Sequence, residues 1–306
     1  MIRTIYVVNE NNELFTLKVR DSDSEESLIF NLEGISEAPG TINTTDSAVI
    51  SGSRFNSSRV NKRNIVLNVA LQAFGNDETF RADLYKFFPV GKPITFGVIT
   101  DTKEVTIQAY TETDEITPFA KVENATISMI CPYPFFKGVL EQVVVVSSVI
   151  PAFSFPFSNE SLTEPLLETG ILQDYPRNFL YYSGDVETGV ILEFYITGGF
   201  GDVLSIYNSS KDQKIEVDLQ LVNDILISNS LPVVESGDVI RINTNPGQKS
   251  AVIVKNGTDI NILNALGFNI DWISLSPGFN DISFLVDYGV EFLSMSVKFY
   301  NLYRGV

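Results

Sequence analysis

The chain contains no histidine among its 306 residues. Histidine is the most frequent general base of enzymes, the group that activates a catalytic serine or cysteine, and a common zinc ligand. Its absence excludes Ser-His-Asp and Cys-His catalysis, and it excludes the zinc sites that use imidazole. We therefore expect a protein that is not an enzyme.

Cysteine is almost absent as well, since Cys131 is the only one. A single thiol forms no internal disulfide and holds no thiolate metal cluster. Cys131 lies in the apolar stretch ISMICPYPFF, and no histidine is present to activate it, so we interpret it as a buried apolar side chain. The sequence thus predicts neither a metal nor any other cofactor.

Positive charge and long hydrophobic runs are scarce too. The chain has 21 Lys and Arg against 38 Asp and Glu, a net charge of −17, which repels phosphate backbones and argues against a specific nucleic-acid partner. The most apolar stretch, residues 143–157, contains two prolines and is shorter than the ~20 residues that span a bilayer. We expect no membrane contact and, without a signal-peptide core near Met1, synthesis in a cytoplasm.

Short segments of alternating hydrophobicity, separated by Gly, Pro and Asn turns, fill most of the sequence. Asn64–Gln72 is typical, because its odd-numbered positions are apolar and its even-numbered ones include Asn68 and Gln72. Prolines and phenylalanines cluster at residues 132–160, and we place a domain boundary after Gly138. The fold class we expect is all-β with one short helix, in two β-sandwich domains, residues 1–138 and 139–306.

The expected helix lies in the segment NDETFRADLYKFFPVG. Phe80, Leu84, Phe87 and Phe88 fall at i, i+4, i+7 and i+8, which places them in one apolar stripe. Pro89 then ends the helix. A second, weaker helical pattern lies near Ile260–Leu266.

Residues Asp21–Arg63 are polar and rich in turn residues. So long a loop is unusual in a compact domain, and it indicates an extended arm or an edge-pairing segment. The basic residues of this segment and one aromatic residue are candidates for a subunit interface: Arg54, Phe55, Arg59, Lys62 and Arg63. Three interpretations remain open here: a solvated loop, a cationic patch that meets an acidic neighbouring subunit, and a site for an anion such as nucleic acid.

Aromatic residues are frequent, and Tyr181, Tyr182 and Trp272 are candidates for a sugar-stacking platform. Packing in a core explains the same residues, and both interpretations remain open. No pair of carboxylates is singled out by its context, so a glycosidase is not favoured.

A series of motifs runs through the chain in order. The first half contains SGSRFNSSRVNKRNIVLNVALQ, RADLYKFFPVGKPITF and ATISMICPYPFFKG, and the second half contains GDVETG, GDVIRINT, LSPGFN and the final YRGV. Together they resemble the siphophage distal tail protein family, and the likeness covers nearly the whole chain.

The resemblance implies a structural virion protein, made in the cytoplasm of the host bacterium. It implies a hexameric ring at the distal end of a non-contractile tail, in which the N-terminal sandwich builds the ring and Asp21–Arg63 supplies an arm or belt loop. The second sandwich is then galectin-like. The implied partners are the other five copies, the tail-tube protein, a tail-associated lysin or tail-fibre-type protein and, in some phages, receptor-binding proteins, while DNA passes through the ring. The alternative function is that of a carbohydrate-binding module for host cell-wall glycans.

Overall fold

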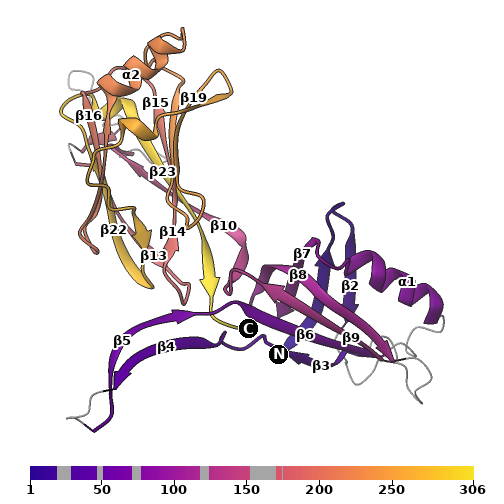
Figure 1. Ribbon diagram of the computed structural model, residues 1–306. Helices are drawn as coiled ribbons and strands as arrows, with labels where there is room; N and C mark the ends of the chain where they lie inside the picture. The colour runs from indigo at the N-terminus through magenta and orange to yellow at the C-terminus, as the bar shows by residue number, and fades with distance from the viewer. Residues whose placement is uncertain (19–28, 47–50, 71–76, 118–123, 152–169, 174) are drawn as a thin grey trace, which may run out of the picture. The chain divides into compact units, whose positions relative to one another are not determined.

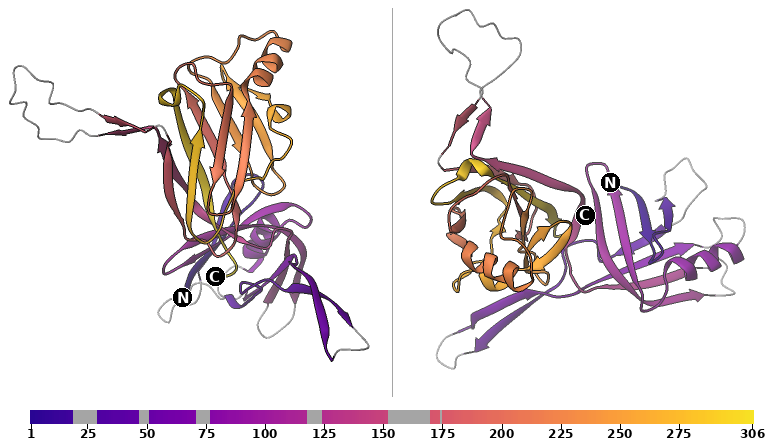
Figure 2. Two further views of the ribbon diagram at one scale, coloured as in Figure 1. Left: turned by 90° about the vertical axis from the view of Figure 1, so that its left-hand side faces the viewer. Right: turned by 90° about the horizontal axis from the view of Figure 1, so that it is seen from above.

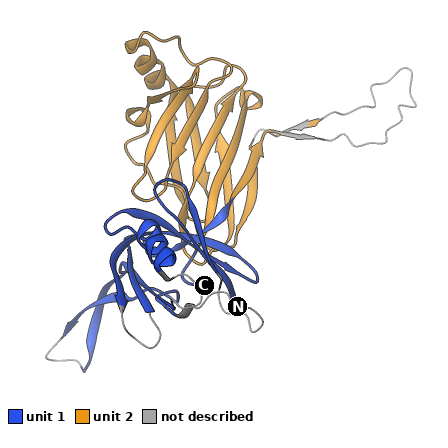
Figure 3. Ribbon diagram, turned by 90° about the vertical axis from the view of Figure 1, so that its right-hand side faces the viewer, with its two compact units in different colours: residues 1–140, 302–306 blue, residues 141–301 orange. Residues whose placement is uncertain are grey.

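The computed structural model describes residues 1–306 except 19–28, 47–50, 71–76, 118–123, 152–169 and 174. The chain divides into two compact units (Figure 3). Unit 1 comprises residues 1–140 and 302–306, and unit 2 comprises residues 141–301. The boundary expected after Gly138 lies close to the first division, but residues 302–306, expected in the second domain, group with unit 1.

Unit 1 is built on one antiparallel sheet in the strand order β2–β1–β7–β8–β9–β6–β3, and the start of β10 pairs with β8. Alternating side chains from these strands form a core of their own. The strands are β1 (Ile2–Val8), β2 (Leu14–Lys18), β3 (Ile29–Glu33), β6 (Arg63–Ala70), β7 (Pro93–Thr100), β8 (Glu104–Thr117), β9 (Asn124–Cys131) and β10 (Phe136–Ser147).

The helix α1 (Asp77–Phe87) belongs to unit 1. Phe80, Leu84, Phe87 and Phe88 are all buried in the core of that unit, as the stripe predicts. The ring of Phe15 stacks on Phe87 with 4.9 Å between centroids, which seats the helix against β2.

The segment Asp21–Arg63 is not one long loop. Where it is described, it forms β3 and then a two-stranded antiparallel hairpin, β4 (Gly40–Asp46) and β5 (Ser53–Val60), which stands apart from the main sheet (Figure 1). We call this hairpin the arm. Its strands consist mainly of Thr, Ser and Asn and lack the apolar alternation that marks a half-buried strand, so the sequence pattern did not predict them.

Unit 2 contains two antiparallel sheets that enclose a second core (Figure 2). One has the order β10–β23–β15–β18–β19–β20 and the other β13–β22–β16–β17. Phe194 of the first meets Phe284 of the second edge to face, with 5.5 Å between centroids, so the unit is a β-sandwich. Its strands are β11 (Val149–Pro151), β12 (Gly170–Leu172), β13 (Arg177–Tyr182), β14 (Thr188–Gly189), β15 (Ile191–Ile196), β16 (Val203–Asn208), β17 (Gln213–Asp218), β18 (Val239–Asn243), β19 (Ser250–Lys255), β20 (Thr258–Asn261), β21 (Ser274–Leu275), β22 (Gly278–Leu285) and β23 (Leu293–Tyr303).

The expectation of a single helix needs correction, because a second helix, α2 (Leu219–Ser228), follows β17 directly. Asp218 caps it by accepting hydrogen bonds from the backbone N–H groups of residues 220 and 221. The weak helical pattern at Ile260–Leu266 contains only a short 3₁₀ turn, η2 (Leu263–Ala265), and a second such turn is η3 (Val290–Phe292). Among the described residues no helix is long and apolar enough to cross a membrane.

Candidate functional site

The arm has two chemically different faces. In the register of the hairpin, Thr44 lies opposite Phe55 and Gly40 opposite Val60. Because alternate residues of a strand share a face, Ile42, Phe55 and Val60 lie on the same side, and all three are exposed. This side of the arm is an apolar surface that the described part of the chain leaves uncovered.

The opposite face of the arm is polar and basic. Arg54 lies opposite Thr45 and Arg59 opposite Thr41, so both arginines point away from the apolar face. Both are exposed, and neither forms an ion pair with any described residue. Lys62 is exposed in the short connection to β6. The arm thus offers two guanidinium groups without an ion-pair partner among the described residues, on a chain of net charge −17.

Arg63, grouped with these residues in the sequence analysis, has a different place. It is buried in unit 1, with its guanidinium 4.7 Å from the centroid of the Phe136 ring. Nε donates to the carbonyl oxygen of Pro134 at 2.8 Å, and Nη1 donates to those of Gly34 and Ser36. An enclosed side chain has no group to offer a neighbouring subunit, so Arg63 is not retained as an interface residue.

The same guanidinium reaches the end of the chain, since Nη2 donates to the carbonyl oxygen of Arg304. The backbone N–H of Val306 donates to the carbonyl of Ile35 at 3.1 Å, and Arg304 pairs with Glu37 at 3.0 Å. Residues 34–37, which lead into the arm, are therefore held by Arg63 on one side and by residues 304–306 on the other. We call this arrangement the Arg63 clamp.

A shallow hollow of about 540 Å³ lies at the end of the arm where Gly40 and Val60 pair. Both strands of the arm and the segment before it contribute to its walls. The lining residues are Glu37, Ala38, Gly40, Ser58, Arg59 and Val60. It therefore joins the apolar face of the arm to the charged residues beside the Arg63 clamp.

The three candidate sugar-stacking residues of unit 2 separate in the structure. Tyr181 is exposed, and its ring lies 5.1 Å from that of Phe279 on the neighbouring strand. Tyr182 is buried and donates its hydroxyl to the carbonyl of Val186 at 2.7 Å, so it presents no ring face to solvent and is not retained. Trp272 packs partly buried against the core, with Lys249 5.1 Å from its ring, and is not retained either.

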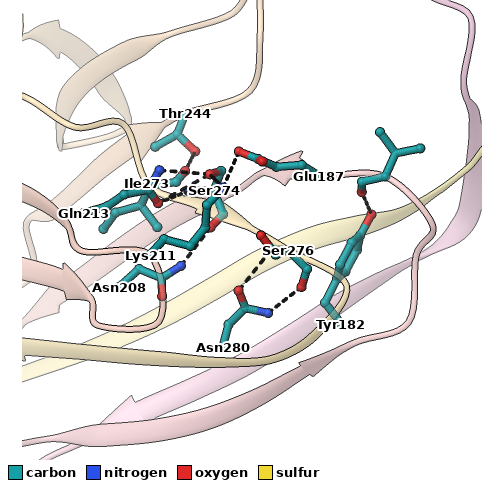
Figure 4. A network of polar contacts seen from close by, with 11 residues as sticks. Tyr182, Glu187, Asn208, Lys211, Gln213, Thr244, Ile273, Ser274, Ser276 and Asn280 are labelled. Atoms are coloured by element: carbon teal, nitrogen blue, oxygen red, sulfur yellow. Dashed lines mark hydrogen bonds and ion pairs between the residues drawn. The ribbon is translucent and has the colours of Figure 1, made fainter.

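Two motifs of the second half contribute to a polar network in unit 2, and a third motif lies beside it (Figure 4). Its centre is Ser274, which accepts hydrogen bonds at Oγ from Lys211 at 2.9 Å and from Gln213 at 3.1 Å. Lys211 pairs in turn with Glu187 of GDVETG at 2.5 Å. Thr244 of GDVIRINT donates to the carbonyl of residue 273 at 2.6 Å.

The third of these motifs, LSPGFN, closes on itself beside the network. Asn280 accepts from the backbone N–H of Ser276 and donates to its carbonyl, at 3.0 and 2.8 Å. Gly189 of GDVETG leaves no room for a side chain, because a Cβ there would lie 2.5 Å from the Cα of Asn245. These motif residues are therefore bonded to one another, and their arrangement stabilises the loops of the sandwich.

No arrangement of reactive groups was found in the described residues. Burial raises the pKa of the Cys131 thiol to about 12, so the nucleophilic thiolate is scarce near neutrality. The described part of the chain contains no cluster of three or more acidic or Cys side chains able to hold a metal ion. The features that remain exposed and unexplained are surfaces: the arm, and the aromatic residues of β13 and β22.

Two residues of the second surface are absent from the candidates that the sequence pattern indicates. Phe179 and Phe279 are exposed beside Tyr181. Phe179 had a recognisable signal, because it lies two positions before Tyr181 in one strand and therefore shares its face. Phe279 comes from a strand that is 98 residues further on in the chain, and only the register of β13 with β22 places it there.

Comparison with known proteins gives matches only among solved structures, since no family model and no curated protein matches the chain. It is similar to SPP1 Dit (gp 19.1), described as a paradigm of the hub adsorption apparatus in phages that infect Gram-positive bacteria. The TM-score is 0.60 and the identity 13%, over 90% of this chain and 93% of that one. Two structures of the phage P2 baseplate in its activated conformation, with Ca and with Sr, match at 10% identity and a TM-score of 0.43. They cover 97% and 98% of this chain, respectively, and 98% of theirs.

The match to SPP1 Dit shows that the two chains share a fold along nearly their whole length. The mostly β architecture expected from the sequence is present in both units. The resemblance of the motifs to distal tail proteins is thus confirmed at the level of the fold.

Proposed function

We propose that the chain is a structural protein of a phage tail tip that assembles with copies of itself into a ring. Two observations of different kinds support this: the fold shared with SPP1 Dit, and the absence of any reactive arrangement among the described residues. The role we propose is therefore one that the exposed surfaces of the described residues can perform.

The arm is the structural feature that best supports self-assembly. A two-stranded hairpin is at best marginally stable in water by itself, and both faces of this one are exposed. A partner that covers the apolar face removes Ile42, Phe55 and Val60 from water. The partner we propose is a second copy of this chain, whose acidic surface complements Arg54 and Arg59 on the other face.

An arm that docks on a different surface of the next copy makes a heterologous contact, and such contacts form a ring when the rotation between neighbouring copies closes. The number of copies, six, follows from the resemblance to distal tail proteins. On the same basis the ring joins the tail-tube protein to a tail-associated lysin or tail-fibre-type protein, with receptor-binding proteins as further partners. The site of action is the virion tail tip, reached after synthesis in the host cytoplasm, and DNA passes through the ring.

The test is the mass of the purified chain in solution, by light scattering after size exclusion, with negative-stain images of the peak. We expect a species of six 34.0 kDa chains with a central hole. Arg54→Glu combined with Arg59→Glu, and Phe55→Ser alone, should each shift the mass towards the monomer. High salt should do the same if charge pairing contributes.

Phe268→Ser is the matched control, because it removes an exposed phenylalanine from unit 2 and should leave the ring intact. A wild-type chain that stays monomeric across concentration contradicts self-assembly. A normal ring from the charge-reversal variant contradicts the role given to the arm.

A further inference from the structure

The outer face of the β13–β22–β16–β17 sheet of unit 2 carries a group of exposed aromatic rings. Tyr181 of β13 lies opposite Phe279 of β22, and their rings meet edge to face at 5.1 Å and 63°. Phe179 lies on the same side of β13, two residues earlier. The exposed fractions are 61% for Phe179, 60% for Tyr181 and 72% for Phe279. We call these three residues the aromatic face.

Charged groups beside the rings neutralise one another. Arg177 donates from Nε and Nη2 to the two carboxylate oxygens of Asp281, at 2.7 and 2.5 Å, and its guanidinium lies 4.6 Å from the centroid of the Phe179 ring. Further along the same sheet Lys214 pairs with Glu216. The half-exposed Arg177 guanidinium is therefore held in a fixed position next to the rings, and the largely buried Asp281 carboxylate neutralises it.

The size of the aromatic face suits a small ligand better than a protein. Three aromatic side chains that are each about 60–70% exposed offer on the order of 400 Å², since a fully buried one covers about 150–250 Å². A standard protein–protein interface buries about 800 Å² on each partner. The area available is about half of that.

The charge of the surface decides the class of ligand. Arg177 is already neutralised by Asp281, so an anionic polymer finds no free cation there and meets a chain of net charge −17. A neutral ligand has no such cost. A sugar ring combines an apolar C–H face, which stacks on the electron-rich face of an aromatic ring, with hydroxyl groups that pair with fixed donors and acceptors.

We infer that the aromatic face binds a neutral glycan, with Tyr181 and Phe279 as the stacking residues and the Arg177 guanidinium, fixed in place by Asp281, orienting the hydroxyl groups. This activity is independent of the proposed ring, because none of these residues belongs to the arm. It replaces the platform of Tyr181, Tyr182 and Trp272 that the sequence suggested.

The test is affinity electrophoresis of the full chain through native gels that contain one polymer each: dextran, galactomannan, xylan or the polyanion polyglycerol phosphate. At least one neutral polysaccharide should retard the wild-type chain. Tyr181→Ala and Phe279→Ala should each weaken the association constant about tenfold. Phe268→Ala, which removes an exposed phenylalanine from elsewhere in unit 2, should migrate as the wild type does.

Three results of the electrophoresis overturn the inference. They are no retardation of the wild type by any of the neutral polymers, retardation by polyglycerol phosphate alone, and unchanged retardation of both Tyr181→Ala and Phe279→Ala. The fluorescence of Trp272 in each variant confirms that unit 2 is folded. A variant that keeps wild-type glycan binding but loses binding to a protein partner of the tail identifies a protein as the occupant. That result also overturns the inference.

Discussion

Removing the Arg63 side chain should destabilise unit 1 and leave unit 2 unchanged. Arg63 donates to four backbone carbonyls, those of Gly34, Ser36, Pro134 and Arg304. A hydrogen bond from a charged donor contributes about 1.5–3 kcal/mol, so four of them set an upper limit of roughly 6–12 kcal/mol. Water entering the space left by alanine restores part of this, and we expect Arg63→Ala to cost about 3–5 kcal/mol.

Arg63→Lys should cost less but remain clearly destabilising. A lysine ammonium has three donors on one atom, whereas the guanidinium spreads its donors over a planar fork. It therefore reaches only some of the four carbonyls, and we expect about half of the loss seen with alanine. Arg54→Ala is the control, because Arg54 is exposed and its removal should change no transition.

The chain carries its own probe for each unit. Cys131, the only cysteine, is buried in unit 1, and its raised pKa of about 12 keeps it unreactive until that unit opens. Trp272, the only tryptophan, packs against the core of unit 2. Urea titration with thiol labelling therefore follows unit 1, and tryptophan fluorescence follows unit 2.

With a urea dependence of about 1–3 kcal/mol per molar, the expected loss lowers the labelling midpoint of Arg63→Ala by about 2 M. The Trp272 midpoint should not move. A loss below about 1 kcal/mol would refute the clamp, because it would mean that four buried hydrogen bonds contribute less than one ordinary one. Equal shifts of both midpoints would refute the assignment of the clamp to unit 1 alone.

Two further predictions concern buried charges in unit 2, both read from Trp272 fluorescence during urea unfolding. Lys255 is buried and pairs with Asp238 at 2.7 Å. Lys255→Met should therefore cost about 3–5 kcal/mol, because it leaves a buried carboxylate unpaired, and adding Asp238→Asn should recover most of that loss. Equal stability of the wild type and Lys255→Met would contradict this prediction. Although burial opposes it, hydrogen bonds from neighbours on β15, β18 and β23 lower the pKa of the buried Glu193 carboxyl. The stability that the ionised Glu193 carboxylate contributes to unit 2 is thus present above the ordinary glutamate pKa and is lost as the pH falls through the lowered pKa of the folded state. Glu193→Gln should therefore lose less stability than the wild type on acidification. An unchanged dependence of stability on acidic pH would contradict this prediction.

Sequence patterns predicted the elements whose side chains face a core. The stripe of Phe80, Leu84 and Phe87 marks α1 because a helix buries one face. The same reasoning missed α2, since Ile215, Val217, Leu219 and Leu221 alternate like a strand. The strand ends at Asp218, and the cap there, followed by the spacing of Leu219, Val222 and Leu226, is the signal that separates the two.

The candidate surfaces were only partly predictable. Tyr181 and Tyr182 are adjacent in a strand and therefore point to opposite faces, so alternation by itself excludes a platform built from both. Arg63 is indistinguishable in sequence from Arg54 and Arg59. The carbonyl groups that bind the buried Arg63 guanidinium come from distant segments of the chain, so no local sequence pattern predicts its burial.

The Arg63 clamp makes the order of synthesis matter. Arg304 follows Arg63 by 241 residues, and at about 5–20 residues per second a ribosome takes roughly 10–50 s to cover that distance. Most of unit 1 is synthesised first, yet residues 34–37 lack the contacts from residues 304–306 until all of unit 2 has been translated. Chains released early by a stalled ribosome would therefore carry an arm that lacks part of its anchor, and such chains would compete poorly with finished copies for a place in the proposed ring.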